Sequence, residues 1–155
     1  MYYIMKILVF SDSHGSVDSM EKTILREHPD QILHLGDYVR DAKKLLKYCI
    51  PLTLVAGNCD SSSSEATILT PEFQGTKIYM THGHLHGVKV MYQRVIYAAL
   101  AENADILLFG HTHRAECFFD QGLWVMNPGA CNTWGSYGVI QLTDGKITCC
   151  LKSID

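Results

Sequence analysis

The chain has 155 residues, of which 47% are hydrophobic, and a formal net charge of −3 at pH 7. This length is typical of one ordinary domain, so we treat residues 1–155 as a single domain. The apolar content suffices for a packed core and argues against intrinsic disorder. The slightly negative net charge argues against nonspecific nucleic-acid binding through a basic surface, and no nucleic-acid recognition motif is found.

Cysteine usage and hydropathy indicate a cytoplasmic protein without a membrane anchor. The six cysteines form no Cys-x-x-Cys pair and no disulfide framework, which suits a reducing compartment. Cys49, Cys117 and Cys150 lie in apolar surroundings and are expected to be buried. No apolar run approaches the roughly 18 residues needed to span a bilayer. Both Met1 and Met5 are compatible with a translation start.

The first half of the chain alternates between predicted strands and helices. Residues 6–10 form an apolar run closed by a turn signal, which predicts a buried strand. An amphipathic helix over 16–27 follows and ends before Pro29. The next predicted elements are a strand, a helix and a strand, at 31–35, 39–48 and 52–56. This order predicts parallel strands joined by right-handed crossovers.

The second half is predicted to contain mainly strands. They are expected at 66–69, 76–81, 105–109, 115–120, 123–126, 138–142 and 146–151. One helix is expected over 87–102, and Thr143-Asp144-Gly145 is typical of a hairpin turn. We therefore expect an α/β fold with a parallel first half and a meander-like second half. Two mixed β-sheets packed face to face and flanked by helices would bury both sets of apolar runs.

Polar residues able to bind metal ions follow five of the apolar strands. Asp12 and His14 come after the first strand, and in extended structure residues i and i+2 point to the same side. The residues after the later strands are Asp37, Asn58, His82, His111 and His113. A glycine beside each segment allows the backbone to turn sharply. Since ligands of α/β sheets collect at the carboxyl ends of strands, one shared metal site is predicted.

Each of these residues also has an alternative role. The polar residues after the first strand can cap the following helix, and Asp37 can cap the second one. Asn58 can hold a left-handed turn. His82 can be a hydrogen-bonded histidine beneath a loop, and the last two histidines can flank an exposed turn. Independent coincidences at five strand ends explain the pattern less well than one shared site does.

The ordered motifs resemble those of the calcineurin-like metallophosphoesterase superfamily. They are Asp12-x-His14, Gly36-Asp37, Gly57-Asn58, Thr81-His82-Gly83-His84 and Gly110-His111-Thr112-His113. The match spans residues 12–113 and is specific as a set, although no single block is. The short length and the motifs are similar to the small bacterial and archaeal phosphodiesterase branch. The resemblance implies a four-layer α-β-β-α sandwich.

The resemblance also implies a binuclear metal site. By position, the ligands of the first ion are Asp12, His14 and His113, and those of the second are Asn58, His82 and His111. Asp37 would bridge the two ions. Nitrogen and carboxylate ligands favour Mn²⁺ as our first expectation, with Ni²⁺, Fe²⁺, Zn²⁺ or Mg²⁺ as alternatives. A hydroxide shared by the ions would attack phosphorus in line with the leaving group.

Position 59 departs from the pattern of many relatives, which carry a histidine directly after the asparagine and use it to protonate the leaving oxygen. Cys59 stands here, a thiol that is protonated at neutral pH but is a weak hydrogen-bond donor. We therefore expect a preference for activated leaving groups, such as aryl rather than alkyl alcohols. His84, two residues after a predicted ligand, is a second candidate acid or can orient His82. A solvent-facing loop position fits His84 equally well.

Two further residues have open roles. Arg40 lies one helical turn beyond Asp37 and can either clamp a phosphate bidentately or lie on the surface. His34 lies within a predicted strand, away from the motifs, and is expected to be structural.

The leading prediction is a metal-dependent phosphodiesterase acting on a small phosphate ester. A phosphomonoesterase or nucleotide phosphatase with the same site is the first alternative, because pocket walls rather than metal ligands select the substrate. A non-catalytic scaffold similar to the retromer subunit of this fold is the second alternative. That subunit has lost part of the ligand set, whereas all seven positions are kept here. Relatives often form dimers or tetramers, so a homo-oligomer is expected from the resemblance.

Overall fold

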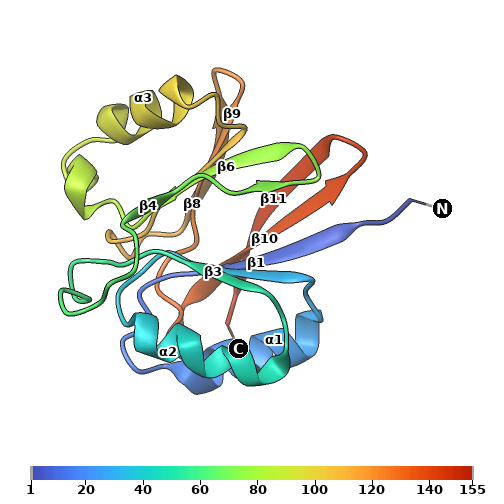
Figure 1. Cartoon of the computed structure of the whole chain (residues 1–155), viewed down its shortest axis with the longest axis vertical. Helices are drawn as coiled ribbons and strands as arrows, with labels where there is room; N and C mark the ends of the chain where they lie inside the picture. Colours follow the sequence, from blue (N-terminus) through green and yellow to red (C-terminus); the bar gives the residue numbers. More distant parts are fainter. Residues whose placement is uncertain (1, 155) are drawn as a thin grey trace.

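Two β-sheets stack face to face in the computed structural model, which describes residues 2–154 (Figure 1). The five-stranded sheet has the order β11-β10-β1-β2-β3. In that order its strands are Lys146–Ser153, Ser136–Thr143, Met5–Phe10, Gln31–His34 and Leu52–Leu54. The second sheet has the order β4-β6-β7-β9-β8, with β5 paired to β6. From β4 to β9, these strands are Ile68–Leu69, Glu72–Phe73, Thr76–Thr81, Ile106–Leu108, Glu116–Asp120 and Leu123–Asn127.

Helices cover the outer faces of both sheets (Figure 1). The first sheet is covered by α1 (Val17–Glu27) and α2 (Val39–Lys43), and the second by α3 (Gln93–Ala101). Two 3-10 helices complete the set: η1 (Lys44–Tyr48) continues α2, and η2 (His84–His86) follows β6. The predicted α/β class, with two mixed sheets between helical layers, is confirmed. Among residues 2–154, no helix combines the length and apolar character needed to cross a bilayer.

Alternation along the strands produces separate cores on the two faces of each sheet. Ile7 and Val9 of β1 join the central core between the sheets, while Leu8 and Phe10 pack toward α1. In the second sheet, Leu107 of β7 packs with α3 while its neighbours face the central core. Both faces of these strands are buried, which explains why their sequences are unbroken apolar runs.

The predicted parallel first half is confirmed, because β1 pairs with β2 and β2 with β3 in parallel. In the second sheet, β6, β7 and β9 are also parallel. The carboxyl ends of parallel neighbours lie at the same edge of a sheet. This topology brings the loops after β1, β2, β3, β6 and β7 to common edges.

The meander-like second half is wrong. The hairpin of β10 and β11 belongs to the first sheet rather than the second. In it, β10 pairs antiparallel with β1, with Ile7 opposite Ile140. Periodicity identifies these strands but not their partners, because pairing with β1 depends on a contact distant in sequence. The hairpin turn itself is as predicted, with positive φ at Asp144 (47°) and Gly145 (78°).

Two helices are shorter than predicted. The helix expected over 87–102 begins only at Gln93, because Gly87 is in a left-handed conformation (φ 64°) and its carbonyl closes a turn with Val90 and Met91. The second predicted helix changes from α to 3-10 geometry at Lys44.

The expected burial of three cysteines is also wrong. Cys49 and Cys150 are exposed and Cys117 is only half-buried, whereas Cys131 and Cys149 are buried. Adjacent strand residues face opposite sides of a sheet, so Cys149 enters the central core and Cys150 faces away from it.

Candidate metal centre

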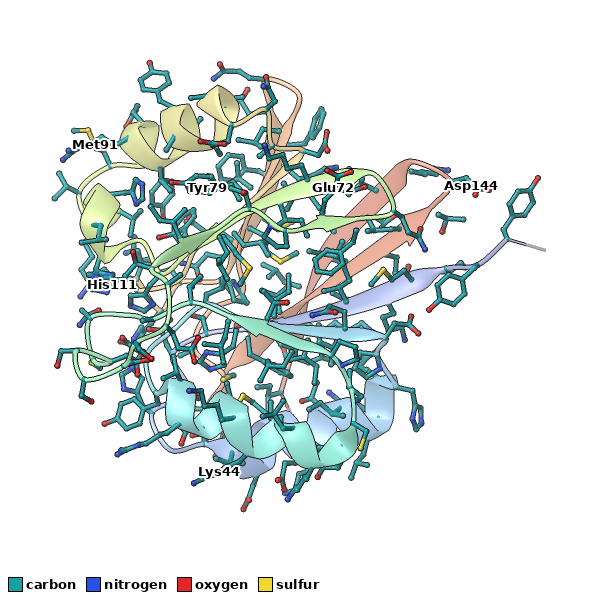
Figure 2. All side chains as sticks on the ribbon, in the orientation of Figure 1. Lys44, Glu72, Tyr79, Met91, His111 and Asp144 are labelled. Carbon is teal, nitrogen blue, oxygen red and sulfur yellow. The ribbon has the colours of Figure 1, made fainter. Side chains whose placement is uncertain are left out.

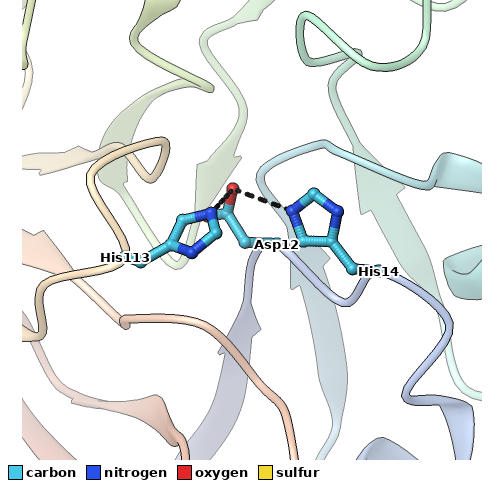
Figure 3. A group of neighbouring side chains, drawn as sticks. All are labelled: Asp12, His14 and His113. Atoms are coloured by element: carbon cyan, nitrogen blue, oxygen red, sulfur yellow. Dashed lines mark ion pairs between the residues drawn. The ribbon is translucent and has the colours of Figure 1, made fainter.

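The candidate ligands lie on loops that directly follow strands of both sheets. Asp12 and His14 follow β1 and Asp37 follows β2, so these three come from the first sheet. His82 follows β6 and His113 follows β7 in the second sheet. Ligand atoms of Asp12, His14 and His113 all lie within 4.8 Å of one another (Figure 3). A second group within the same limit consists of Asp12, Asp37 and His82.

The carboxylate of Asp12 is buried and only half satisfied. Its Oδ2 accepts hydrogen bonds from the Ser11 hydroxyl at 2.6 Å and from the backbone N–H of His111 at 3.1 Å. Within residues 2–154, its buried Oδ1 has no hydrogen-bond partner. The nearest imidazole atoms are Nε2 of His113 at 3.2 Å, of His82 at 3.8 Å and of His14 at 3.9 Å. A buried carboxylate oxygen without a partner is costly, and a cation among these nitrogens would satisfy it.

Asp37 turns its two carboxylate oxygens toward different histidines. Its Oδ1 lies 3.4 Å from Nε2 of His82 and accepts a hydrogen bond from the backbone N–H of Cys59 at 3.0 Å. Its Oδ2 lies 3.6 Å from Nε2 of His14. Burial alone would raise the pKa of Asp37, but His82 and the Cys59 N–H outweigh this and hold the pKa well below its ordinary range. The carboxylate is therefore ionised at neutral pH and can offer one oxygen to each of two cations.

His82 is fully buried, and its ring orientation is fixed. Nδ1 lies 2.9 Å from the backbone carbonyl oxygen of Leu35, which can only accept, so Nδ1 carries the proton in the neutral ring. Nε2 then faces the centre, 3.2 Å from Nδ1 of His111. Burial lowers the pKa of His82, but the carboxylates of Asp37 and Asp12 outweigh this effect and raise it. A ring anchored through one nitrogen, with the other aimed at carboxylates, is typical of a metal ligand.

Five candidate ligands have a left-handed backbone. The φ angles are 54° at Asp12, 42° at His14, 58° at Asp37, 69° at His111 and 61° at His113. Residues other than glycine rarely adopt positive φ, and such strained positions concentrate at functional sites. The expectation that Asp12 and His14 lie on an extended segment is therefore wrong. A turn after β1, rather than the pleat of a strand, directs both side chains to one point.

The alternative roles of the carboxylates as helix caps, and of Asn58 as a left-handed turn residue, are wrong as well. The N-cap positions of α1 and α2 are Ser16 and Tyr38, and neither helix has a side-chain cap. The Asp37 carboxylate contacts Cys59 and two histidines instead. Asn58 is not among the residues of 2–154 that have a positive φ, so it does not hold a left-handed turn.

Glycines allow the backbone to pass close to both carboxylates. A Cβ on Gly110 would overlap the Ser11 hydroxyl and lie 2.8 Å from Oδ2 of Asp12. A Cβ on Gly57 would overlap Oδ1 of Asp37. The ligand loops therefore require glycine for close approach, as the motifs suggested.

Asn58 and Cys59 lie on the exposed loop after β3. The side-chain amide of Asn58 donates to Sγ of Cys59 at 3.6 Å. Sγ of Cys59 lies within 4.8 Å of ligand atoms of His14 and Asp37, so the thiol borders the centre, although it is not one of the predicted metal ligands. Burial and the nearby charge of Asp37 raise the pKa of Cys59, and the thiol is protonated at neutral pH.

His84 lies beside the ligand cluster. Its ring centre is 5.5 Å from that of His82 and 6.2 Å from that of His111. In Figure 2, His111 marks this cluster at the edge of the molecule, between the two sheets. Burial and the charge of His82 lower the pKa of His84, which keeps its ring neutral at pH 7. The half-buried ring is thus not the solvent-facing loop residue considered as an alternative.

A family model of the calcineurin-like phosphoesterase superfamily domain matches residues 5–145. The chain belongs to this superfamily. The probable metallophosphoesterase YsnB of Bacillus subtilis is 35% identical over 129 residues, which cover 81% of this chain and 75% of the relative. The phosphodiesterase YfcE of Escherichia coli is 26% identical over 153 residues, covering 82% and 79%. The vacuolar protein sorting-associated protein 29 of Schizosaccharomyces pombe is also similar, at 28% over 134 residues, covering 81% and 72%.

A solved structure supports the same assignment. A Streptococcus pneumoniae protein described as a predicted phosphoesterase superimposes with a TM-score of 0.84 and 28% identity, over 99% of this chain and 91% of that one. The predicted calcineurin-like membership and the sandwich fold are therefore confirmed.

Two buried residues support the first ligand loop of this calcineurin-like domain. Asp41 accepts hydrogen bonds from the Ser13 hydroxyl at 3.0 Å and from the Gly15 N–H at 2.7 Å, which closes the turn after β1. Nδ1 of His34 accepts from the Gly36 N–H at 3.1 Å, and its Nε2 lies 3.3 Å from the Ser13 hydroxyl. Burial lowers the pKa of His34 to about 4. His34 thus has a structural role, as expected, whereas the role of Asp41 was not predicted.

Asp60 and Asn127 support the other ligand loops, a role that was not predicted for either residue. Asp60 accepts from the backbone N–H groups of Tyr38 and Val39, at 2.9 and 3.0 Å, and of Gly57 at 2.9 Å. The Asn127 amide donates to the carbonyl of Gly110 at 3.1 Å and to the hydroxyl of Thr112 at 2.9 Å. Asp60 follows the Gly57-Asn58 motif, and Asn127 ends a strand, but neither position alone predicts which loop it holds.

Proposed function

We propose that the protein is a metal-dependent phosphodiesterase with two divalent ions, Mn²⁺ in first place, held by Asp12, Asp37 and the histidines around them. The observation that carries the proposal is Oδ1 of Asp12, which is buried among three imidazoles with no hydrogen-bond partner in residues 2–154. Oxygens of two buried carboxylates within 4.8 Å repel each other unless positive charge lies between them. Imidazole and carboxylate ligands suit Mn²⁺, Fe²⁺, Ni²⁺ and Zn²⁺.

The ligand roles follow the family pattern. Asp12, His14 and His113 would hold one ion, and Asn58, His82 and His111 the other. Asp37 would bridge them, which its two oxygens support by facing His14 and His82 separately. Asn58 would offer its side-chain oxygen to the second ion, because its amide nitrogen is the atom that contacts Cys59.

When bound, the two ions would polarise the phosphoryl group and activate water for attack on phosphorus. The residues around them orient the reaction. The bond from His82 to the Leu35 carbonyl keeps Nε2 directed at the centre. Of the two candidate acids, Cys59 keeps its proton at neutral pH, whereas the ring of His84 is neutral and a weaker donor. We therefore assign protonation of the leaving oxygen to Cys59.

The surroundings of the centre favour a diester over a monoester. One pocket of about 310 Å³ includes Cys59 and Tyr38 in its lining, and another of about 400 Å³ includes His113 and Trp134. A phosphodiester carries two organic groups, and each of these pockets can receive one of them. A monoester has a single organic group and would leave one pocket unused.

A metal screen tests this proposal. Protein stripped with a chelator is reloaded with Mn²⁺, Ni²⁺, Fe²⁺, Zn²⁺ or Mg²⁺ and assayed on bis(p-nitrophenyl) phosphate and p-nitrophenyl phosphate. We expect two bound ions per chain, highest activity with Mn²⁺ and faster hydrolysis of the diester. Asp37→Ala should abolish both ion pairing and turnover. A faster reaction with the monoester would favour a phosphomonoesterase or nucleotide phosphatase.

The same screen tests the scaffold alternative, which is supported by the similarity to a vacuolar sorting protein. Two bound ions without hydrolysis of any ester would support a retromer-subunit-like interaction module. We further propose a cytoplasmic location, because all six thiols are free. Size-exclusion chromatography with light scattering tests the expected dimer or tetramer.

A further inference from the structure

A cationic pocket adjoins the candidate metal centre. It has a volume of about 310 Å³ and is lined by Tyr38, Val39, Arg40, Lys43, Cys59, Asp60, Ser62 and Ser63. We call these residues the arm pocket. Two of them touch the centre: Cys59 lies within 4.8 Å of ligand atoms of Asp37, and the Tyr38 ring is edge-on to His14 at 4.9 Å. A molecule whose phosphate lies at the centre can therefore extend into the arm pocket.

Two residues that line the arm pocket, Arg40 and Lys43, carry positive charge. The Arg40 guanidinium lies over the Tyr38 ring at 4.6 Å, and no ion pair to Arg40 occurs within residues 2–154. Stacking on an aromatic face holds the guanidinium plane while its N–H groups stay free. Lys43 forms an ion pair with Glu65 at 2.8 Å, but both side chains are partly exposed, so the pair is weak.

The single acid of the arm pocket, Asp60, pairs with neither Arg40 nor Lys43 in residues 2–154. Asp60 is buried, and its oxygens accept three backbone N–H bonds from Tyr38, Val39 and Gly57. Its carboxylate thereby holds the pocket wall in place. The serines add polar capacity, since the Ser63 oxygen accepts from the Glu65 N–H and its own proton remains available to an anion.

We propose that the arm pocket binds a second anionic group of phosphate type, carried by one organic arm of the substrate. The proposal rests on the phosphodiesterase function proposed above and names its substrate class: diesters with a phosphorylated arm. The phosphate to be cleaved lies at the metal centre. The second phosphate meets the Arg40 fork, which suits bidentate binding, together with Lys43 and the serine hydroxyls.

Two matched diesters test the proposal. The p-nitrophenyl ester of thymidine 5′-phosphate is compared with the same compound carrying a phosphate on its 3′ hydroxyl. Both release p-nitrophenolate, so only the second phosphate differs. We expect a kcat/KM about tenfold higher for the 3′-phosphorylated compound, mainly through KM. Arg40→Gln should lower this preference at least about fivefold, because it removes the fork.

Lys44→Gln is the matched control. It removes the same charge from the neighbouring chain segment, but Lys44 is exposed, does not line the arm pocket and lies on the outer face of the helical layer (Figure 2). The control should keep the wild-type activity and preference. A loss of preference equal to that of Arg40→Gln would show diffuse attraction by net charge and overturn the proposal.

A binding measurement needs no turnover and separates the two proposals. Metal-loaded protein is titrated by calorimetry with thymidine 3′,5′-bisphosphate and with thymidine 5′-monophosphate. We expect about tenfold tighter binding of the bisphosphate in the wild type, and a loss of this advantage in Arg40→Gln. Equal affinities in the wild type, or an advantage that survives the joint change Arg40→Gln and Lys43→Gln, would overturn the arm pocket. Absence of hydrolysis with every metal, despite the bisphosphate advantage, would overturn the diesterase function alone.

Discussion

Oδ1 of Asp12 lies 3.2 Å from Nε2 of His113, although β1 of one sheet precedes the first residue and β7 of the other precedes the second. The two side chains meet only when the sheets are packed against each other. A cation bound between them would therefore bind the folded chain and not the unfolded one, so metal binding and folding stability are linked.

Asp12→Asn should separate these two effects. In chelator-treated protein, the amide removes one of two neighbouring buried negative charges, so we expect a Tm that is unchanged or higher. With free Mn²⁺ at a hundred times its Kd, the free energy of unfolding of the wild type should rise by about 2.7 kcal/mol. That of the variant should rise by less than a third of this amount. Calorimetric melting with and without Mn²⁺ measures both quantities.

Asp144→Asn serves as its control, because Asp144 lies in the β10–β11 turn, far from the centre (Figure 2). This variant should keep the full gain on adding Mn²⁺. If Asp12→Asn gained as much as the wild type, Asp12 would not be a metal ligand.

Gly110→Ala should weaken metal binding without touching a ligand side chain. The new Cβ would displace the Ser11 hydroxyl, which fixes Oδ2 of Asp12. We expect a loss of about tenfold or more in Mn²⁺ affinity by calorimetry. Gly75→Ala has open space around its Cβ but a left-handed backbone (φ +76°), which Gly110 lacks, so it should cost about 1 kcal/mol of stability and leave the affinity intact. Equal affinities in the two variants would contradict the expected role of Gly110.

Cys59→His should change the leaving-group preference. A doubly protonated imidazole ring, unlike the neutral ring of His84, donates a proton to an alkyl leaving oxygen more effectively than a thiol, while an aryl leaving group needs little help. We expect kcat/KM for an alkyl diester to rise about tenfold relative to an aryl diester. Rates across a series of leaving groups measure the effect, with the exposed Cys49→His as control. If the relative rates across the series did not change, position 59 would have no role as a general acid.

The buried ring of His34 predicts a loss of stability in mild acid. Burial lowers its pKa from 6.5 to about 4, so between these values the unfolded chain binds the extra proton. Stability therefore rises with pH across this window and is lost as pH falls. From pH 7 to pH 5 the loss attributable to His34 should be about 2 kcal/mol.

Urea unfolding of chelator-treated protein at both pH values measures this loss. His34→Gln should reduce the pH dependence by that amount, whereas the exposed His28→Gln should preserve it. The same pH dependence in all three proteins would refute the assignment to His34.

Local spacing in the sequence was sufficient to predict several features. The apolar runs that precede Asp12, Asp37 and His82 predicted where strands end. Buried strands consist of continuous apolar residues, and the polar residues that follow mark their ends. The order of strands and helices predicted parallel pairing in the first sheet. The ordered motifs then indicated the superfamily that the comparisons confirm.

Other features depend on contacts between distant segments. Pairing of β10 with β1 depends on which buried faces fit together, and periodicity carries no such information. The support of ligand loops by Asp41, Asp60 and Asn127 is equally nonlocal, since each accepts or donates across the chain.

The sequence alone determined the kinds of groups available for binding metal ions and their positions after strands. Only the tertiary structure decided how these groups face one another. It placed Asp12 and His14 on a left-handed turn, directed the two oxygens of Asp37 to separate histidines and left Oδ1 of Asp12 without a partner. The reason is physical: backbone strain and partnerless buried charge arise when packing of the whole fold outweighs local preferences.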